Sequence, residues 1–455
     1  MNGSLHERFN FRDRASLEEK IARLGLEIPL ADDISPLLRP LTVGATTLPN
    51  RLVTLPMEGA DAGPDGGPTD LTFRRYRRFA RGGCGLIWFE AAAVRAEGRG
   101  NPRQLMLTDH TVGAFGRLAA ETRRAAVESF GPGRPLLLIL QLTHAGRFAR
   151  PKGRAAPVIA QHSPLLDERQ RLPPDYPLIS DDGLDALRGD FVRAAELARE
   201  AGFDGVDLKA CHGYLLSELL GSRTRPDSRY GGPLENRARL LLETAREVRS
   251  AAPGLLVACR LNLFDALPWP HGFGADPRGG EAEDLSEPIE LIGKLVFEGV
   301  APLAVTCGVP AYRPHYGRPY DTPMTGDQAP AEHPLVGVAR WLRLAGTVQA
   351  AFSALPVIGG GYSWLRRFFP HVAAAMVQAG KTSLIGLGRE ALAYPEFAAD
   401  LAGRGALDPG RVCTTCSKCS EMLRGGSAVG CAVRDAVLYA PEYRRARRAR
   451  NKEDH

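Results

Sequence analysis

Residues 185–210, DALRGDFVRAAELAREAGFDGVDLKA, join a helix to a strand and decide the fold. Residues 185–201 repeat apolar side chains at helical spacing, and Gly202 follows as the kind of residue that ends helices. Residues 205–210 then form a short, largely apolar strand. Strands that alternate with helices build a parallel sheet covered on both faces, so this unit predicts a barrel or a doubly wound sheet. The apolar face of the helix consists of Leu187, Phe191, Ala194, Ala195 and Ala198.

The same alternation continues along most of the chain. A second helix is predicted over 235–251, and short apolar or β-branched runs recur between helical segments. With 205–210 they make eight candidate strands, so we predict an α/β fold of the closed (β/α)8 TIM-barrel type. The other seven are 51–57, 86–94, 136–144, 255–262, 303–308, 356–360 and 382–389. Long loops rich in Pro and Gly follow three of the strands, on the face where barrel enzymes carry their chemistry.

The composition is that of a globular protein. Of 455 residues, 44% are hydrophobic and 24% are charged, which excludes disordered and fibrous chains. The net charge of +6 is concentrated at one end, because residues 444–455 carry +4 and the remainder only +2. We interpret this basic tail as a solvated, disordered end, with a dock for an acidic redox partner or for nucleic acid as the alternative.

Four regions are expected along the chain. Residues 1–36 form an N-terminal arm with an amphipathic helix near 16–25, 37–405 the barrel, 406–443 a cysteine-rich segment and 444–455 the basic tail. No stretch has the apolar core of a secretory signal or the roughly 18 apolar residues of a membrane span. We therefore expect a cytoplasmic protein that has no membrane partner.

Polar residues follow several strands, where a barrel places its active site. The first strand ends in Leu-Pro-Met-Glu-Gly (55–59), the third in Gln-Leu-Thr-His-Ala-Gly-Arg (141–147) and the fourth in Lys-Ala-Cys-His-Gly-Tyr-Leu-Leu (209–216). The last two strands end in glycines, and loops there commonly bind phosphate through backbone N–H groups. Ordinary turn glycines are the alternative, but an adjacent arginine favours an anion site. The candidates are Gly360, Gly361, Gly388 and Arg389.

These segments resemble the Old Yellow Enzyme family of FMN-dependent NADH:flavin oxidoreductases. The resemblance extends over residues 36–440 and is most specific in Arg-Tyr-Gly-Gly-Pro-Leu-Glu-Asn-Arg (229–237), besides 141–147 and 211–216. It implies a barrel that holds FMN at its mouth. It also implies that Pro56 and Met57 line the isoalloxazine ring, that Gln141 bonds the pyrimidine edge and that Arg260 faces N1 and O2.

A fixed guanidinium at that place stabilises the anionic reduced flavin, which supports the role of Arg260. A core salt bridge for Arg260 and a plain capping amide for Gln141 are the alternatives.

The resemblance further implies which residues handle the substrate. Two side chains after the fourth strand, usually His with His or Asn, bond a substrate carbonyl, and the following Tyr supplies a proton. His212 and Tyr214 match this pattern, but Lys209 stands where the first His is expected, and a core role for the tyrosine is the alternative. Glu58 stands where the family usually has Thr, Ser or Cys. We hypothesise that Glu58 and Lys209 form an ion pair beside the flavin, with two independent rim charges as the alternative.

Four of the eight cysteines are crowded together. Cys413, Cys416, Cys419 and Cys431 follow the pattern Cys-x2-Cys-x2-Cys-x11-Cys. Three closely spaced thiols and a fourth brought by chain return suit a [4Fe-4S] cluster, whose irons each need one ligand. Zinc, which usually draws on paired Cys-x2-Cys knuckles, and free thiols are the alternatives.

The cysteine pattern is similar to that of the iron–sulfur subgroup of the family, which includes 2,4-dienoyl-CoA reductase and trimethylamine dehydrogenase. That resemblance implies electron transfer between the cluster and FMN. Those proteins continue into FAD- and nucleotide-binding domains, which we do not expect here because the sequence runs only to His455. The electron donor is therefore left open among NADH or NADPH, a separate flavoprotein and a ferredoxin.

We expect an enzyme that reduces the C=C bond of an α,β-unsaturated carbonyl compound, such as an enoate or enoyl thioester, with hydride from FMN N5 and a proton from Tyr214. Tyr312 and His315 are weaker substrate-binding candidates. An amine dehydrogenase or demethylase is the rival; it would need an aromatic cage, and the cation of Lys209 argues against it. The cage candidates are Trp269, Tyr312, Tyr316 and Trp364. An electron-transfer subunit is the third possibility, and we expect a small-molecule substrate, a homo-oligomer and no nucleic-acid partner.

Overall fold

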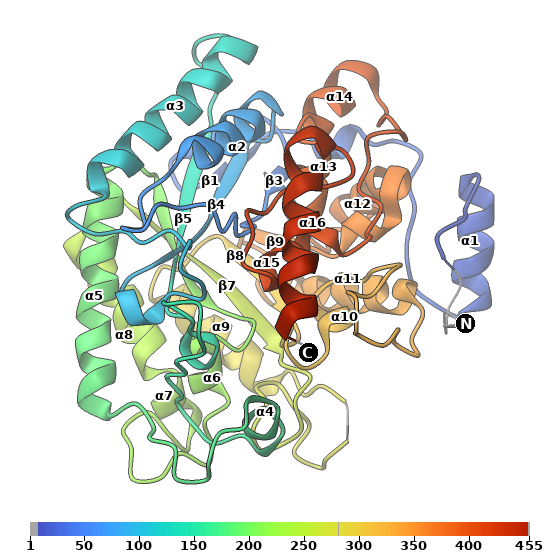
Figure 1. Cartoon of the computed structure of the whole chain (residues 1–455). Helices are drawn as coiled ribbons and strands as arrows, with labels where there is room; N and C mark the ends of the chain where they lie inside the picture. Colours follow the sequence, from blue (N-terminus) through green and yellow to red (C-terminus); the bar gives the residue numbers. More distant parts are fainter. Residues whose placement is uncertain (1–7, 281, 454–455) are drawn as a thin grey trace.

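The computed structural model describes residues 8–280 and 282–453 and contains a closed barrel of eight parallel strands (Figure 1). The strands are hydrogen-bonded in the order β10-β3-β4-β5-β6-β7-β8-β9. Every predicted strand is present, so the (β/α)8 prediction is confirmed. The strands are β3 (Leu52–Thr54), β4 (Leu86–Ala93), β5 (Leu137–Thr143), β6 (Gly205–Ala210), β7 (Leu256–Phe264), β8 (Leu303–Cys307), β9 (Val357–Gly359) and β10 (Leu384–Leu387).

A hairpin closes the N-terminal end of the barrel. β1 (Leu41–Val43) and β2 (Thr46–Leu48) pair antiparallel. Val43 and Leu48 are fully buried and pack against interior side chains such as Trp88. The sequence pattern did not indicate this hairpin. Because it fills the N-terminal end, the C-terminal ends of the strands are left to receive a ligand.

Helices surround the barrel. The helix predicted over 185–201 is α5 (Asp181–Glu200), whose first turn is capped because the Ser180 hydroxyl accepts the Gly183 N–H at 3.0 Å. The helix predicted over 235–251 is divided into α7 (Leu234–Arg237) and α8 (Arg239–Ala251). The other helices are α1 (Arg14–Arg23), α2 (Asp70–Arg81), α3 (Val112–Phe130), α4 (Pro164–Gln170), α6 (Leu215–Leu220), α9 (Ser286–Phe297), α10 (Pro314–Gly317), α11 (Pro334–Ala351), α12 (Phe369–Gln378), α13 (Arg389–Ala393), α14 (Phe397–Arg404), α15 (Lys418–Arg424) and α16 (Ala436–Glu453), with 3-10 turns η1 (Ser35–Leu38), η2 (Ala96–Gly98), η3 (Gly146–Phe148) and η4 (Tyr362–Phe368).

The described part of the N-terminal arm is attached to the barrel. α1 contains the predicted amphipathic segment, with Leu17 and Ile21 buried. Phe9 and Phe11 meet the Trp364 ring edge-on, with centroids 5.3 and 6.2 Å away. These aromatic contacts hold the arm against η4, so Trp364 serves the packing of the arm.

The C-terminal segment corrects one prediction. α15 and α16 pack against each other (Figure 1), with Tyr439 and Ala446 of α16 buried. α16 runs through Glu453, so residues 444–453 are helical and the prediction of a disordered tail is wrong there, because this apolar contact orders the segment. Residues 454–455 and the side chains of 449–453 lie outside the described part. None of the helices described is long and apolar enough to span a lipid bilayer.

Candidate active site at the barrel mouth

A cavity of about 550 Å³ opens at the C-terminal ends of the strands. Its walls come from the ends of β3, β5, β6 and β7 and from the loops after β8, β9 and β10. This volume is in the range of small-molecule and cofactor sites. The cavity brings together most of the predicted site residues, namely Pro56, Met57, Glu58, Gln141, Lys209, His212, Tyr214, Arg260, Gly361, Gly388 and Arg389.

A buried carboxylate that the sequence interpretation missed holds Gln141 and Arg260. Asp207, in the middle of β6, accepts hydrogen bonds from Gln141 Nε2 at 2.5 Å, from Trp88 Nε1 at 2.9 Å and from the Arg260 backbone N–H at 2.7 Å. Burial raises the pKa of the Asp207 carboxyl to about 6, against the opposing effect of these bonds. Asp207 fixes one amide N–H of Gln141 and leaves its carbonyl oxygen available to a ligand. The sequence feature that could have indicated this residue is an aspartate within an otherwise largely apolar strand.

The Arg260 side chain lines the cavity. Across the described part of the chain, no carboxylate forms an ion pair with its guanidinium. The geometry therefore does not support the core salt bridge that was the alternative for this residue. The guanidinium is available to a ligand with a negative or electron-rich edge.

Glu58, Lys209 and Tyr214 form a polar triad on the cavity wall. Glu58 Oε1 accepts hydrogen bonds from Lys209 Nζ at 3.3 Å and from the Tyr214 hydroxyl at 3.1 Å. Lys209 Nζ also lies 3.6 Å from the centre of the Tyr214 ring, within cation–π range. The Lys209 side chain is only 4% exposed, so Glu58 compensates a buried charge. The hypothesised ion pair between Glu58 and Lys209 is present.

Burial and nearby charges determine the protonation of Tyr214 and His212. Burial, and then the Glu58 carboxylate, raise the pKa of Tyr214 well above its ordinary value, so the phenol keeps its proton near neutral pH. Burial and the positive charges of Arg260 and Lys209 hold the pKa of His212 well below its ordinary value, so its imidazole is neutral. His212 also has φ 66°, a left-handed conformation that non-glycine residues adopt mainly at special sites. The wall therefore carries a neutral imidazole and a protonated phenol whose O–H is held by Glu58.

Three loop candidates do not line the cavity, although residues next to them do. Tyr312 packs in a small apolar cluster, and His315 contacts the ring of its neighbour edge-on. A Cβ at Gly360 would stand 2.4 Å from the ring of Trp341, so this glycine serves close packing. Only Gly361 of the glycine pair lines the cavity. Tyr312, His315 and Gly360 thus have packing contacts here, and their roles at the site stay predictions.

The aromatic residues considered for an amine cage are dispersed. Trp364 is fully buried, and its indole N–H donates to Asp321 at 2.7 Å. Trp269 stacks with the guanidinium of Arg223, 4.1 Å from its ring centre. None of Trp269, Tyr312, Tyr316 and Trp364 lines the cavity. These four residues form no cage there, which corrects the cage expectation.

The cavity end beside β9 and β10 fits a phosphate. Arg389 Nη2 donates to the Pro319 carbonyl at 2.7 Å, whereas Arg389 Nη1 is buried without a hydrogen-bond partner in the described part of the chain. A Cβ at Gly388 would stand 2.8 Å from Met57 Sδ, so the chain approaches closely there. An orphaned guanidinium N–H beside a close glycine backbone suits a bound anion. The residues present at this mouth therefore fit FMN.

The four crowded cysteines meet in a second, smaller cavity. Cys413, Cys416, Cys419 and Cys431 all line it, and Arg389 lines both cavities. The Thr415 N–H donates to Cys413 Sγ at 3.4 Å and the Arg434 N–H donates to Cys431 Sγ at 3.3 Å. Over residues 8–280 and 282–453, no three His, Cys, Asp or Glu side chains are arranged to hold a single metal ion. Convergence of four thiols fits the donor set of a [4Fe-4S] cluster, which stays a prediction.

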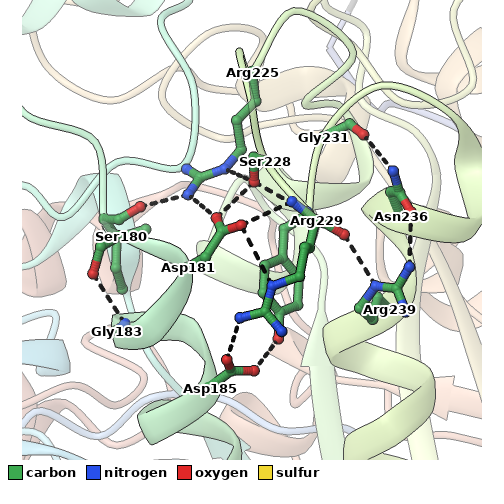
Figure 2. A network of polar contacts seen from close by, with 12 residues as sticks. Ser180, Asp181, Gly183, Asp185, Arg225, Ser228, Arg229, Gly231, Asn236 and Arg239 are labelled. Carbon is green, nitrogen blue, oxygen red and sulfur yellow. Dashed lines mark hydrogen bonds and ion pairs between the residues drawn. The ribbon is translucent and has the colours of Figure 1, made fainter.

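The stretch that carries the resemblance most specifically has a structural role. Residues 229–237 do not line the main cavity but lie beside α5 (Figure 2). Asp181 accepts hydrogen bonds from Ser228 Oγ at 2.6 Å and from the Arg229 N–H at 2.8 Å. The Arg229 guanidinium reaches Asp185 at 2.5 Å. These contacts tie the first turns of α5 to the loop before α7 and thereby hold the frame of the barrel.

Comparisons with known proteins agree with this site. The sequence model of the NADH:flavin oxidoreductase / NADH oxidase family matches residues 36–293. The NADPH dehydrogenase of Listeria monocytogenes is 32% identical over 252 residues, which cover 53% of this chain and 70% of that protein.

Two solved structures share the fold. A 2-naphthoyl-CoA reductase has a TM-score of 0.70 at 21% identity and covers 90% of this chain, and histamine dehydrogenase from Rhizobium sp. 4-9 has 0.66 at 20% identity and covers 88%. This chain spans 58% and 52% of those two proteins. Since the family match covers more than half of the sequence, the chain belongs to the NADH:flavin oxidoreductase / NADH oxidase family and is a flavin-dependent oxidoreductase.

Proposed function

We propose that the protein reduces the C=C bond of an α,β-unsaturated carbonyl compound, with the carbonyl bound by His212 and the proton supplied by Tyr214. The observation that carries this proposal is the pair of hydrogen-donating side chains on one wall of a flavin-sized cavity. A neutral imidazole and a protonated phenol suit a carbonyl oxygen and a carbanion, respectively.

The residues around the cavity suggest how FMN is held. Pro56 and Met57 would contact the ring, Gln141 its pyrimidine edge and Arg260 its N1 and O2 side. Gly361, Gly388 and Arg389 would take the phosphate. When bound, FMN would supply the hydride from N5.

The proton would come from the triad. Tyr214 would give its proton to the carbon next to the one that receives the hydride. The Lys209 ammonium, 3.6 Å from the ring centre, would offset the negative charge left on Tyr214, whose oxygen would then recover a proton from solvent. Glu58 acts as a positioning residue, because its carboxylate holds both Tyr214 and Lys209.

We further propose that the four cysteines bind a [4Fe-4S] cluster that exchanges electrons with the flavin. Arg389 lines both the cysteine cavity and the main cavity, which supports a short path between them. The electron donor would be NADH or NADPH, or a flavoprotein or ferredoxin that docks near α15. An acidic partner would meet the exposed Arg444, Arg445, Arg447 and Arg448 of α16.

The test begins with anaerobic purification and separates the two half-reactions. We expect bound FMN, iron and sulfide, flavin reduction by NADPH or NADH, and reoxidation by 2-cyclohexenone or a cinnamoyl thioester. Tyr214→Phe should slow reoxidation by about 10²- to 10⁴-fold and leave flavin reduction unchanged. Tyr312→Phe is the matched control, because Tyr312 does not line the cavity. A colourless protein that binds no flavin would contradict the proposal.

A second candidate, an amine dehydrogenase, gains one argument from the structure. Glu58 neutralises Lys209, so the cation that argued against an ammonium substrate is compensated. The dispersed aromatic residues weigh against this activity. Flavin reduction by histamine or trimethylamine, and not by NADPH or NADH, would favour it. Flavin reduction by an electron-carrier protein without turnover of an enone or an amine would favour an electron-transfer subunit.

A further inference from the structure

Arg318 and Arg389 present unsatisfied N–H groups to the same cavity. Arg318 follows α10, in the loop after β8, and Arg389 follows β10. Both line the main cavity. Arg318 Nη2 and Arg389 Nη1 are buried and have no hydrogen-bond partner among the residues described. Buried donors of this kind are rare in folded proteins and point to a missing acceptor.

The electrostatics point to a missing anion. Burial, and next the positive charge of Arg389, lower the pKa of Arg318 to about 10. Neither guanidinium forms an ion pair with a carboxylate in the described part of the chain. Two neighbouring cations with buried N–H groups and no ion pair to a carboxylate are costly, and a bound anion would relieve that cost.

The rest of the Arg318 side chain is firmly held. Arg318 Nη1 donates to Ser417 Oγ at 2.8 Å, and Ser417 Oγ donates to the Thr322 carbonyl at 2.6 Å. The guanidinium also lies 4.8 Å from the centre of the Tyr320 ring. The turn between Cys416 and Cys419 therefore fixes the donor that faces the cavity.

We infer that Arg318 and Arg389 together bind one phosphomonoester group, which is the phosphate of FMN. This inference rests on the proposed function only in taking FMN as the ligand of the cavity. A phosphate accepts from several guanidinium N–H groups at once, so two arginines from separate loops can close on it. Arg318 is a phosphate ligand that the sequence interpretation did not assign.

The barrel topology favours the flavin phosphate over a phosphate of the substrate. β10, which Arg389 follows, lies four strands from β6, which carries Lys209, so the two face each other across the barrel. A phosphate held at β10 lets the attached ring extend toward Tyr214 on the opposite wall. A substrate phosphate at this place would instead put its own reacting end where the flavin ring must lie.

The test compares FMN with riboflavin, which has the same ring and no phosphate. The full-length chain is stripped of flavin and titrated with each, and the dissociation constants are read from flavin fluorescence. Arg318→Gln should raise the Kd of FMN by about 10- to 100-fold, as expected for the loss of charge-assisted hydrogen bonds, and leave that of riboflavin within about threefold. Arg318→Lys, which keeps the charge but not the planar donors, should fall between.

Arg313→Gln is the matched control, because it removes the same charge from the same loop, and Arg313 does not line the cavity. Thermal unfolding of each variant shows whether it folds. Equal weakening of FMN and riboflavin by Arg318→Gln, or no weakening of either, would overturn the inference. Binding of inorganic phosphate to the FMN-loaded proteins is measured by equilibrium dialysis. If the wild type binds phosphate and Arg318→Gln does not, the site belongs to a substrate phosphate, and the inference is overturned as well. A wild-type chain that binds neither flavin would instead overturn the proposed function and this inference with it.

Discussion

The substitution Glu58→Gln tests whether the Glu58 carboxylate compensates the buried charge of Lys209. In Glu58→Gln the carboxylate that compensates Lys209 becomes an amide of similar size. The Lys209 side chain is 4% exposed and its ammonium lies 3.3 Å from Glu58 Oε1. Two unit charges at that separation attract by about 5 kcal/mol at an effective dielectric constant of 20, before the cost of desolvation is subtracted. Breaking a buried pair costs about 3–5 kcal/mol, and the remaining amide oxygen places our expectation near 3 kcal/mol.

The same substitution should change the pH dependence of proton transfer. The Glu58 carboxylate helps raise the pKa of Tyr214, so its removal lowers that pKa. In wild type the phenol stays protonated throughout the assay range. In Glu58→Gln the rate of flavin reoxidation by an enone should fall at the alkaline end, where the wild-type rate is still flat. Stopped-flow reoxidation between pH 6 and pH 10 measures this.

Glu97→Gln provides the control. Glu97 also pairs with an arginine, Arg95, at 3.3 Å, but its side chain is 49% exposed. An exposed pair contributes at most about 1 kcal/mol, so this variant should unfold in urea almost as wild type does. Two results together would refute the reasoning: Glu58→Gln is as stable as Glu97→Gln, and its reoxidation rate depends on alkaline pH as the wild-type rate does. The pair would then not be electrostatically coupled to Tyr214.

Three further predictions concern the cofactor contacts. Burial raises the pKa of Asp207 from 3.8 to about 6, so its contribution to stability is present at low pH and lost as the pH rises through 6. The free energy of unfolding is measured by urea titration for wild type and Asp207→Asn. Relative to wild type, the variant should gain up to about 3 kcal/mol between pH 4 and pH 7. A difference between the two proteins that does not change with pH would contradict the pKa shift. Cys431→Ser should lose iron and sulfide but keep FMN, as measured by elemental analysis and absorbance, whereas Cys84→Ser, outside the cysteine cavity, should keep both. Arg260→Gln should lower the flavin reduction potential by about 30–60 mV in spectroelectrochemical titration, and an unchanged potential would remove Arg260 from the flavin.

The barrel and much of its mouth could be predicted because strand periodicity fixes where strands end. Once eight strands close, the residues after them converge, which is why Gln141, Lys209 and Tyr214 lie at one cavity without being close in sequence. The pairing of Glu58 with Lys209 followed from the same convergence, although Glu58 follows β3 and Lys209 lies in β6, three strands away, so that two long side chains meet at the mouth.

Features that depend on loop paths could not be predicted in this way. Gly361, and not Gly360, lines the cavity because φ 86° at Gly361 turns the chain after β9, and no periodicity encodes that turn. The role that we infer for Arg318 depends on the meeting of the loop after β8 with the cysteine turn at Ser417, a contact between distant segments. α16 was misjudged because its arginines suggest solvent, while its burial of Tyr439 depends on packing with α15.

The charges at the mouth separate the two halves of the proposed reaction in space. Arg389 belongs to the β10 side and lines both cavities, so electrons from the cysteine pocket would arrive there. Lys209 and Tyr214 belong to the β6 side, where Glu58, reaching over from the end of β3, balances Lys209 and holds the proton donor. Because the two sides face each other across the barrel, a substitution at one should alter one half-reaction and spare the other. If electrons entered and the proton was delivered on the same wall, a single substitution there would alter both half-reactions.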